Sequence, residues 1–296
     1  MRPMRIVSLL PAATEIVAAL GLADELVGRS CRCDAPPGIA AVPALTIATE
    51  PRDRLDVEAL VAAAPDLILT QELCTVCAVG ADEVRAIARE RIPGATVVSL
   101  EPDSVEGILN AVATVGAYAE AEDEAVGLVE ILRERLGEIE ARVQERRLAG
   151  IPPRRVVVLE WVDPPFASGH WIPEMVRRAG GWELLGREGA PAVPSDWERV
   201  REIDPELIVV AACGMDARAA AEAWAAAPVP GWIGGLRAAR DRAIVAVDGD
   251  GLFARPGPRV VEGIALLARL FDPDGFADLV PETGAIVLPA PAPGPR

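Results

Sequence analysis

Lysine is absent from this chain of 296 residues, and histidine occurs once, as His170. The lack of lysine excludes a Schiff-base lysine and the lysine of a phosphate-binding P-loop. With a single histidine, general acid–base chemistry would rest on carboxylates or on His170 alone. The sequence also contains no GxSxG elbow, no GxGxxG and no HExxH motif. These absences weaken an enzyme reading without excluding it.

Positive charge and aromatic residues are scarce as well. The 29 arginines stand against 45 acidic residues, so the net charge is −16 and the pI is about 4.6. No basic face can then neutralise phosphates, which argues against nucleic-acid binding. Aromatic residues make up 4% of the chain, and the 6 tryptophans outnumber the 4 phenylalanines and the single tyrosine. Each tryptophan is therefore worth locating in the fold.

Long apolar runs are missing too. No apolar stretch reaches the length of about 18 residues that a transmembrane helix needs. The apolar beginning of the chain resembles a signal peptide, but Pro11 and Glu15 interrupt it. Residues 6–10 instead predict a strand, followed by a helix. As written, the chain is expected in the cytoplasm, where an odd number of cysteines, 5, is also at home. A missing leader would place it in the periplasm or outside the cell.

Short apolar strands alternate with helices, which predicts an α/β fold with parallel sheets covered on both faces. Residues 121–149 differ, because apolar residues recur there every three or four positions. This pattern predicts one long helix, with acids at its start and arginines at its end. The predicted organisation is two Rossmann-like lobes, residues 1–119 and 151–280, joined by a spine helix over residues 120–150 and followed by a loose proline-rich tail, residues 281–296.

The second half of the chain repeats the first in outline. Residues 56–70 read DVEALVAAAPDLILT, and residues 196–210 read DWERVREIDPELIVV. Both contain an acid, an amphipathic helix, a proline with an acid, and an apolar strand. A repeat at an offset of about 140 residues indicates two similar lobes and not a solenoid.

The stretch EWVDPPFASGHWIPE, residues 160–174, is the first candidate for a ligand site. It follows an apolar run, residues 156–159, that predicts a buried strand. It contains an acid, two tryptophans and the only histidine: Glu160, Trp161, Trp171 and His170. Its three prolines predict a rigid loop without regular structure. Such a loop at the carboxyl end of a strand is where α/β proteins bind ligands. The alternative is a packing loop anchored by tryptophan.

Cysteines follow other predicted strands. Cys31 precedes Cys33 in one loop of the first lobe, and Cys74 and Cys77 form a CxxC pair in another. Cys213 ends a strand of the second lobe. Thiolates with an imidazole suit zinc or iron. The candidate metal ligands are Cys33, Cys74, Cys77 and His170. Packing cysteines and a redox-active CxxC pair are the alternatives.

Charged side chains lie at further strand exits. Arg29 and Arg255 belong to loops of opposite lobes, and arginines in such loops often hold carboxylate or phosphate groups. A surface salt bridge is the alternative for either arginine. The acids at strand exits are Glu72, Glu101, Glu160 and Asp163.

Several segments together resemble the cobalamin- and iron-chelate-binding substrate-binding proteins of ABC importers. They are the opening RIVSLLPAATEIVAALGLADELVGRS, the two repeated segments, and DGDGLFARPGPRVVEGIALLARLF, and the similarity spans roughly residues 5–272. The motifs LC..CAV and EW.DP..F..GHW.PE resemble a cobalamin-binding-like subgroup. The resemblance implies a ligand held in a cleft between two lobes, a rigid spine helix, and an ABC importer as partner. No cofactor is expected to be required, and a corrinoid or a metal ion, zinc or iron, is the group expected to be bound.

The sequence and the resemblance together predict a binding protein for a corrinoid ligand. The predicted binding residues are Arg29, Glu72, Cys74, Glu160, Trp161, Asp163, His170, Trp171 and Arg255. The tryptophans would supply flat apolar contact, the arginines would meet amide or carboxylate edges, and His170 would approach the ligand's metal. Trp171→Ala is then expected to abolish tight binding with little change in melting temperature. The alternatives are a metal or iron-chelate site of cysteines and histidine, and an enzyme that modifies a corrinoid or tetrapyrrole.

Overall fold

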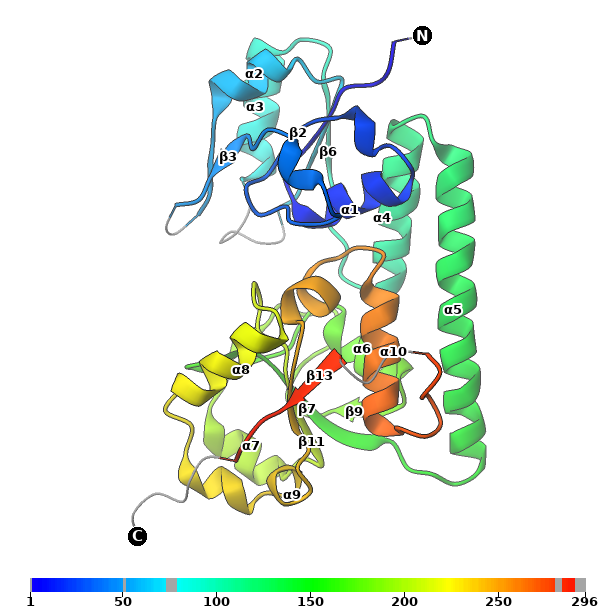
Figure 1. Ribbon diagram of the computed structural model, residues 1–296, viewed down its shortest axis with the longest axis vertical. Helices are drawn as coiled ribbons and strands as arrows, with labels where there is room; N and C mark the ends of the chain where they lie inside the picture. Colours follow the sequence, from blue (N-terminus) through cyan, green and yellow to red (C-terminus); the bar gives the residue numbers. More distant parts are fainter. Residues whose placement is uncertain (1, 50–51, 73–78, 280–283, 291–296) are drawn as a thin grey trace. The chain divides into compact units, whose positions relative to one another are not determined.

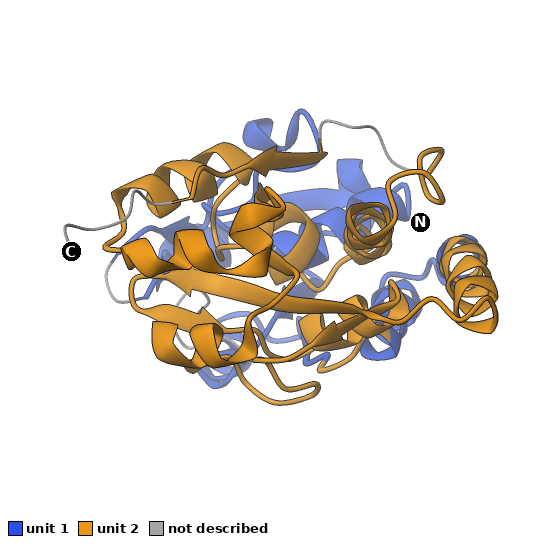
Figure 2. Cartoon of the chain, turned by 90° about the horizontal axis from the view of Figure 1, so that it is seen from below, with its two compact units in different colours: residues 1–102, 106–132 blue, residues 103–105, 133–296 orange. Residues whose placement is uncertain are grey.

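The structure is a computed structural model, and it describes residues 2–49, 52–72, 79–279 and 284–290 (Figure 1). The chain divides into two compact units (Figure 2). Unit 1 comprises residues 1–102 and 106–132, and unit 2 comprises residues 103–105 and 133–296. Both units alternate strands and helices, so the predicted α/β class is confirmed. The predicted long helix is α5 (Glu122–Leu148), whose 27 residues belong to both units.

The main sheet of unit 1 has four parallel strands in the order β2-β1-β5-β6. These strands are β1 (Ile6–Ser8), β2 (Leu26–Arg29), β5 (Leu67–Thr70) and β6 (Thr96–Ser99). The helices are α1 (Pro11–Ala19), α2 (Val57–Ala63), α3 (Ala81–Arg91) and α4 (Val105–Tyr118), with 3-10 turns at Ala23–Glu25 and Ile39–Ala41 and a small antiparallel pair, β3 (Thr46–Ile47) and β4 (Arg54–Leu55). Val7 and Ile68 pack with Leu60 of α2 and Val84 of α3 in one buried cluster.

The sheet of unit 2 has the order β10-β8-β7-β11-β12-β13, and β9 also pairs with β7. Strands β7, β9, β11 and β12 run parallel, whereas β8, β10 and β13 are antiparallel to their neighbours. The strands are β7 (Arg154–Val162), β8 (Pro165–Ala167), β9 (Gly181–Glu183), β10 (Val193–Pro194), β11 (Leu207–Val210), β12 (Ile244–Val247) and β13 (Ala285–Val287). The helices are α6 (Ile172–Arg178), α7 (Trp197–Ile203), α8 (Ala217–Ala226), α9 (Arg237–Arg240) and α10 (Val260–Phe271), with a 3-10 turn at Gly231–Gly235 and a π-helical turn at Asp250–Ala254.

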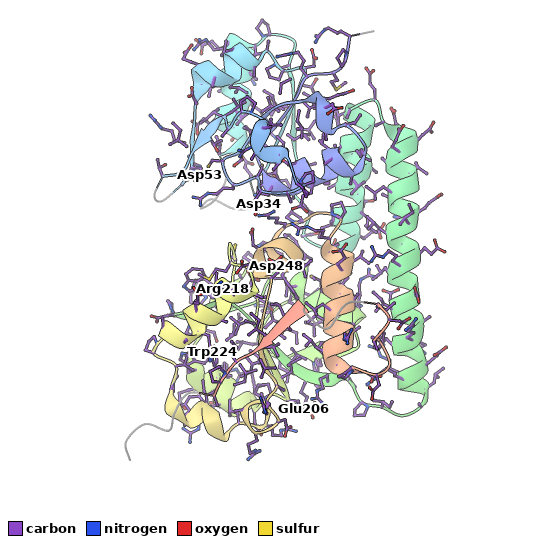
Figure 3. The ribbon with its side chains drawn as sticks, viewed as in Figure 1. Asp34, Asp53, Glu206, Arg218, Trp224 and Asp248 are labelled. Carbon is purple, nitrogen blue, oxygen red and sulfur yellow. The ribbon has the colours of Figure 1, made fainter. Side chains whose placement is uncertain are left out.

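Both faces of the unit 2 sheet are covered. On one face Val157 and Ile208 pack with Val200 of α7 and with Trp224 of α8, which is labelled in Figure 3. On the other face lie α6 and α10, which contact each other. All four residues of the run 156–159 are 0% exposed, which confirms the predicted buried strand. The continuous apolar sequence follows from burial on both faces.

The repeat recognised in the sequence extends to the helix caps. The Asp56 carboxylate accepts a hydrogen bond from the Ala59 amide at 3.0 Å, and the Asp196 carboxylate accepts one from the Arg199 amide at 2.7 Å. Each side chain satisfies an amide that the first turn of its helix leaves unpaired. Helices α2 and α7 then end on residues with positive φ, Ala64 at 41° and Asp204 at 44°. The two segments therefore fold alike, including the same left-handed stop before the strand.

The prediction of a loose tail is wrong for residues 285–287. They form β13, which pairs antiparallel with β12. Leu288, only 4% exposed, packs into the core of unit 2, and the Trp224 indole donates a hydrogen bond to the Pro289 carbonyl at 3.2 Å. The surrounding prolines and glycines hid this short apolar strand. Among the described residues, no helix combines the length and the apolarity needed to cross a bilayer.

Candidate ligand site at the strand exits of unit 2

The carboxyl ends of β7, β11 and β12 lie side by side, because these three strands are parallel neighbours. The loops that follow them are joined by backbone hydrogen bonds. The Cys213 amide donates to the Glu160 carbonyl at 3.1 Å, and the Asp250 amide donates to the Met215 carbonyl at 3.1 Å. Gly249 is needed at this edge, since a Cβ there would lie 2.4 Å from the Ala212 carbonyl oxygen. Figure 3 labels Asp248, which directly follows β12.

The first part of the stretch predicted as an irregular loop, residues 160–167, lies in a β-hairpin, so the prediction is wrong for these residues. Strand β7 continues to Val162, the chain turns at Asp163 and Pro164, and β8 returns antiparallel to β7. Trp161 pairs with Phe166 across the two strands. The prolines are compatible with the hairpin because Pro164 lies in the turn and Pro165 begins β8, where a strand tolerates proline. Pro173 lies in the first turn of α6, a favoured place for proline.

His170 follows the hairpin in a left-handed backbone conformation, with φ of 50°. Its amide donates to the Ala190 carbonyl at 2.6 Å, and its carbonyl accepts from the Gly189 amide at 2.8 Å. A non-glycine residue in this conformation stores strain of order 1–3 kcal/mol, which these two hydrogen bonds help to hold. Strained residues of this kind cluster at functional sites.

The imidazole of His170 is half-buried and faces no hydrogen-bond partner among the described residues. Burial lowers the pKa of His170 below its ordinary value of 6.5, although the nearby charge of Asp103 acts in the opposite direction. The ring is therefore neutral at pH 7 and has a lone pair to offer. The Trp171 ring lies beside it, with 5.7 Å between the ring centroids.

The two tryptophans of the motif have different environments. Trp171 is 6% exposed, and its indole N–H donates to the Phe253 carbonyl at 2.7 Å. Trp161 is 37% exposed, and its indole N–H donates to the carbonyl of Asp163, itself exposed in the turn, at 3.0 Å. Most of the Trp171 surface is thus used within the protein, whereas Trp161 presents aromatic surface to solvent.

Glu160 holds the loop that leads to His170. One carboxylate oxygen, Oε1, accepts a hydrogen bond from the Gly169 amide at 2.8 Å. Burial raises the pKa of Glu160 to about 7, and the hydrogen bond from Gly169 opposes the rise only in part. Gly169 fits closely against the chain, since a Cβ there would lie 2.2 Å from the Ala192 nitrogen. Glu160 is therefore a loop anchor that changes charge near neutral pH.

The two predicted arginines are engaged inside their own units. Arg29 donates from Nε to the carbonyls of Ile39 and Val42, at 3.0 Å each, and from Nη1 to the carbonyl of Ser30 at 2.9 Å. These bonds hold the loop that contains Cys31 and Cys33. Arg255 is 7% exposed and forms an ion pair with Asp250.

The remaining predicted residues of unit 1 are only partly described. The Glu72 amide donates to the Glu101 carboxylate at 2.8 Å, so two of the predicted acids are neighbours. Cys33 is buried, with its sulfur 3.0 Å from the Thr14 hydroxyl. Cys74 and Cys77 lie outside the described residues. Within the described part of the chain, no three His, Cys, Asp or Glu side chains gather as a metal site would require. The predicted zinc or iron site stays a prediction.

One anchoring residue of this region was not predicted. Glu183 accepts hydrogen bonds from the amides of Val158, Leu185 and Gly186, at 2.9, 2.9 and 2.8 Å. The segment that follows packs against the hairpin, because a Cβ on Gly186 would lie 2.4 Å from the Ser168 carbonyl oxygen. The sequence signal was weak: an acid between Trp182 and a leucine pair does not indicate which amides it will meet.

Comparison with known proteins places these features in a family. The sequence profile described as "Periplasmic binding protein" matches residues 6–249. An uncharacterized ABC transporter substrate-binding lipoprotein of Bacillus subtilis, YvrC, is 26% identical over 285 residues, which cover 93% of this chain and 82% of that protein. A vitamin B12-binding protein of Vibrio cholerae is 24% identical over 264 residues, which cover 88% of this chain and 86% of that protein.

The fold is shared with solved structures as well. The crystal structure of a periplasmic heme-binding protein from Pseudomonas aeruginosa superimposes with a TM-score of 0.74 at 21% identity, covering 100% of this chain and 99% of that one. The family profile matches far more than half of the 296 residues. The chain therefore belongs to the periplasmic binding protein family.

Proposed function

We propose that this protein binds a corrinoid ligand at the strand-exit loops of unit 2, with His170 directed at the metal of the ligand. The observation that carries the proposal is the state of His170. Its backbone is fixed by two hydrogen bonds, and its imidazole is neutral and faces no hydrogen-bond partner within the described residues. A neutral imidazole held in one place is a ready ligand for a transition metal.

The chain is a substrate-binding protein of the ABC-importer type, which takes a small molecule and works with an importer. Members of this family bind ligands and do not transform them, so the enzyme alternative is set aside. Either a corrinoid or a heme-like iron chelate agrees with the relatives. The corrinoid is favoured because the vitamin B12-binding relative is similar in sequence over 88% of this chain, whereas the heme-binding relative shares the fold alone.

The other predicted residues take supporting roles in this proposal. Trp161 supplies exposed aromatic surface on the hairpin, and Asp163 fixes the indole through its carbonyl. Glu160 anchors the loop before His170. Trp171 and Arg255 are buried, and in this proposal they stabilise the loops without touching the ligand. Arg29, Glu72 and Cys74 of unit 1 stay predictions as binding residues.

His170→Asn tests the proposal. Asparagine tolerates a left-handed backbone, so the loop should keep its shape while the imidazole is lost. The dissociation constant for aquocobalamin should rise about tenfold or more, which corresponds to a loss of about 1.4 kcal/mol or more. Absorbance of the corrin bands measures both the affinity and the change of axial ligand.

Cyanocobalamin is the matched control, because its upper axial position is blocked by cyanide. Both proteins should bind it alike if His170 acts through the metal. Hemin, titrated in parallel, measures the heme alternative. Equal affinity of the wild type and His170→Asn for aquocobalamin would remove His170 from the proposal. In the wild type, affinity for aquocobalamin should stay constant from pH 8 to 6.5 and fall only below, since protonation of His170 needs a pH under its ordinary pKa.

We also propose that the protein acts outside the cytoplasm, on the side of the membrane from which an importer takes up its substrate. The substrate-binding lipoprotein of Bacillus subtilis supports this location. Cys213 is an exposed thiol that can report this. A membrane-impermeant maleimide applied to intact cells should label Cys213 of the native protein and should fail to label a Cys213→Ser variant at that site. Labelling only after cell lysis would support the cytoplasmic expectation instead.

A further inference from the structure

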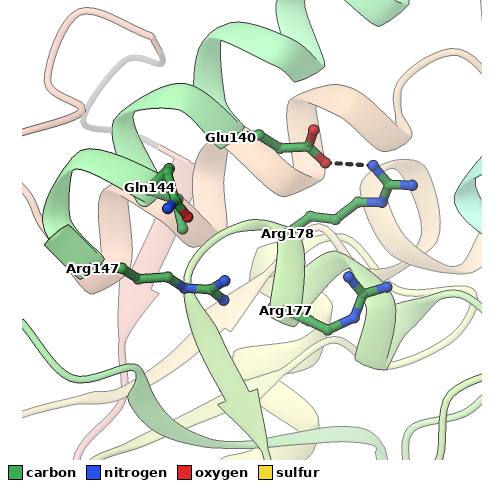
Figure 4. A pocket seen from close by; sticks show the side chains of 6 residues that line it. Glu140, Gln144, Arg147, Arg177 and Arg178 are labelled. Carbon is green, nitrogen blue, oxygen red and sulfur yellow. Dashed lines mark hydrogen bonds and ion pairs between the residues drawn. The ribbon is translucent and has the colours of Figure 1, made fainter.

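A cavity of about 160 Å³ lies in unit 2, between the C-terminal part of α5 and the last turn of α6 (Figure 4). It is lined by Glu140, Val143, Gln144, Arg147, Arg177 and Arg178. Three arginines and a single acid thus line one cavity, in a chain whose net charge is −16. Three arginines and one glutamate give the lining a formal charge of +2, although Glu174 and Glu188 also pair with two of these arginines.

Backbone geometry brings the two helices close enough for this. Gly180 follows α6 with φ of 91°, a conformation that L-residues with side chains rarely adopt. A Cβ there would lie 3.2 Å from the Val143 side chain of α5. The negative ends of helix dipoles favour arginines in last turns, but this alone does not direct them into one cavity.

Two of the three arginines are held in place by carboxylates. Arg178 donates from Nε to Glu174, which is 5% exposed, at 2.7 Å and from Nη1 to Glu140. Arg177 donates from Nε and Nη2 to Glu188 at 3.0 and 2.9 Å. Among the described residues, Nη2 of Arg178 and Nη1 of Arg177 have no hydrogen-bond acceptor. In each arginine, two guanidinium nitrogens are held by carboxylates, and the third nitrogen is left to bind another acceptor.

Arg147 differs from its neighbours on α5. Arg142 pairs with Glu138 and Asp278, both at 2.7 Å, and Arg146 pairs with Asp272. The Arg147 side chain makes no hydrogen bond or ion pair with any residue that the structure describes, whereas its backbone carbonyl accepts a bond from the Gly150 amide at 3.0 Å. Arg147 lines the cavity together with Arg177 and Arg178, and Figure 4 shows its side chain reaching from α5 toward α6. Arg142 and Arg146 thus each have an acidic partner near this end of α5, whereas the Arg147 side chain has none among the described residues.

We propose that this cavity binds a small multivalent oxyanion of the phosphate class, held by Arg147, Arg177, Arg178 and the amide of Gln144. The planar guanidinium fork matches the oxygens of a tetrahedral oxyanion in pairs. A water molecule occupies about 30 Å³ of liquid, so the cavity has room for an anion that replaces several waters. The oxyanion is a second ligand, separate from the one proposed for the loops around His170.

Isothermal titration calorimetry of the whole chain with inorganic phosphate, at an ionic strength kept constant with sodium chloride, tests the site. We expect saturable binding at one site. Arg147→Gln should raise the dissociation constant at least tenfold, and the double variant Arg147→Gln/Arg177→Gln should abolish binding. Because the Arg147 side chain makes no hydrogen bond or ion pair among the described residues, its replacement should leave the fold intact, as circular dichroism can verify.

Arg218→Gln is the matched control, since Arg218 is an exposed arginine of α8 that pairs with Glu222 and with no other side chain in the described part of the chain. It should leave phosphate binding unchanged. Corrinoid affinity should also be unchanged in Arg147→Gln, so failure of this site and failure of the corrinoid proposal are separate results. Phosphate binding that is absent, or that is equally strong in Arg147→Gln and in the wild type, overturns the inference.

Discussion

Trp171→Ala is expected to lower the free energy of unfolding by about 3–5 kcal/mol, the range for removing a large buried aromatic side chain. The indole is 6% exposed and donates a hydrogen bond to the Phe253 carbonyl at 2.7 Å. The substitution leaves a cavity and an unsatisfied carbonyl. For a chain of this size the melting temperature should fall by on the order of 10 °C. Denaturant unfolding measured by circular dichroism gives the free energy.

Two further variants separate packing from ligand contact. Trp171→Phe keeps a ring but removes the N–H, so the loss should be about 1–3 kcal/mol, mainly from the unpaired Phe253 carbonyl. Trp161→Ala, at a residue 37% exposed, should change stability by less than about 1 kcal/mol and weaken ligand binding instead. The structure thus favours the opposite of the initial expectation for Trp171. An unchanged unfolding midpoint for Trp171→Ala with lost binding would restore that expectation.

Glu160→Gln is expected to stabilise the protein at pH 8 and to leave it nearly unchanged at pH 5. Burial raises the pKa of Glu160 from 4.5 to about 7, so the folded state holds this proton more tightly than the unfolded state. Its contribution to stability is complete below pH 4.5 and is lost as the pH rises through 7. At 1.36 kcal/mol for each pKa unit, the loss is about 3 kcal/mol at pH 8.

Glutamine removes the charge and keeps the acceptor for the Gly169 amide, because only one carboxylate oxygen of Glu160 takes a hydrogen bond in the described structure. The gain at pH 8 minus the gain at pH 5 should therefore approach about 3 kcal/mol. Glu183, whose pKa burial also raises to about 7, contributes equally to both proteins and cancels. If the gains at pH 8 and at pH 5 were equal, burial would not raise the pKa of Glu160.

Glu183→Gln provides the contrast. Both carboxylate oxygens of Glu183 accept backbone amides, so the amide of glutamine would direct an N–H at another N–H. Its gain at pH 8 should be smaller than that of Glu160→Gln. Two acids with the same pKa are thus distinguished by their hydrogen bonds.

Much of the fold could be predicted because local pattern and tertiary structure agree. The run 156–159 reads as a buried strand because both faces of the sheet are covered, and the long helix reads from its spacing. The repeated segments carry their own caps in Asp56 and Asp196. In each of these places a short-range signal is sufficient.

The sequence predicts where the candidate site lies in the chain, but it does not predict the conformation of the site. The prolines of residues 160–174 indicated an irregular loop, because a sequence does not show that Pro165 begins a strand and Pro164 fills a turn. Nothing local distinguishes Trp171 from Trp161, since burial of Trp171 depends on the carbonyl of Phe253, far along the chain. The arginines of the oxyanion cavity come from helices α5 and α6, which only tertiary structure brings together.

The position of β13 bears on how unit 2 is completed during synthesis. The strand pairs with β12 along residues 285–287 and is synthesised after every other strand that the structure describes. Until then, the apolar strand Ile244–Val247 has one edge of unpaired amides and carbonyls, which is a template for pairing with other chains. The nascent protein thus depends on residues 285–287 for protection of this edge against aggregation, and any truncation or fusion that displaces them leaves β12 as an open edge of the sheet.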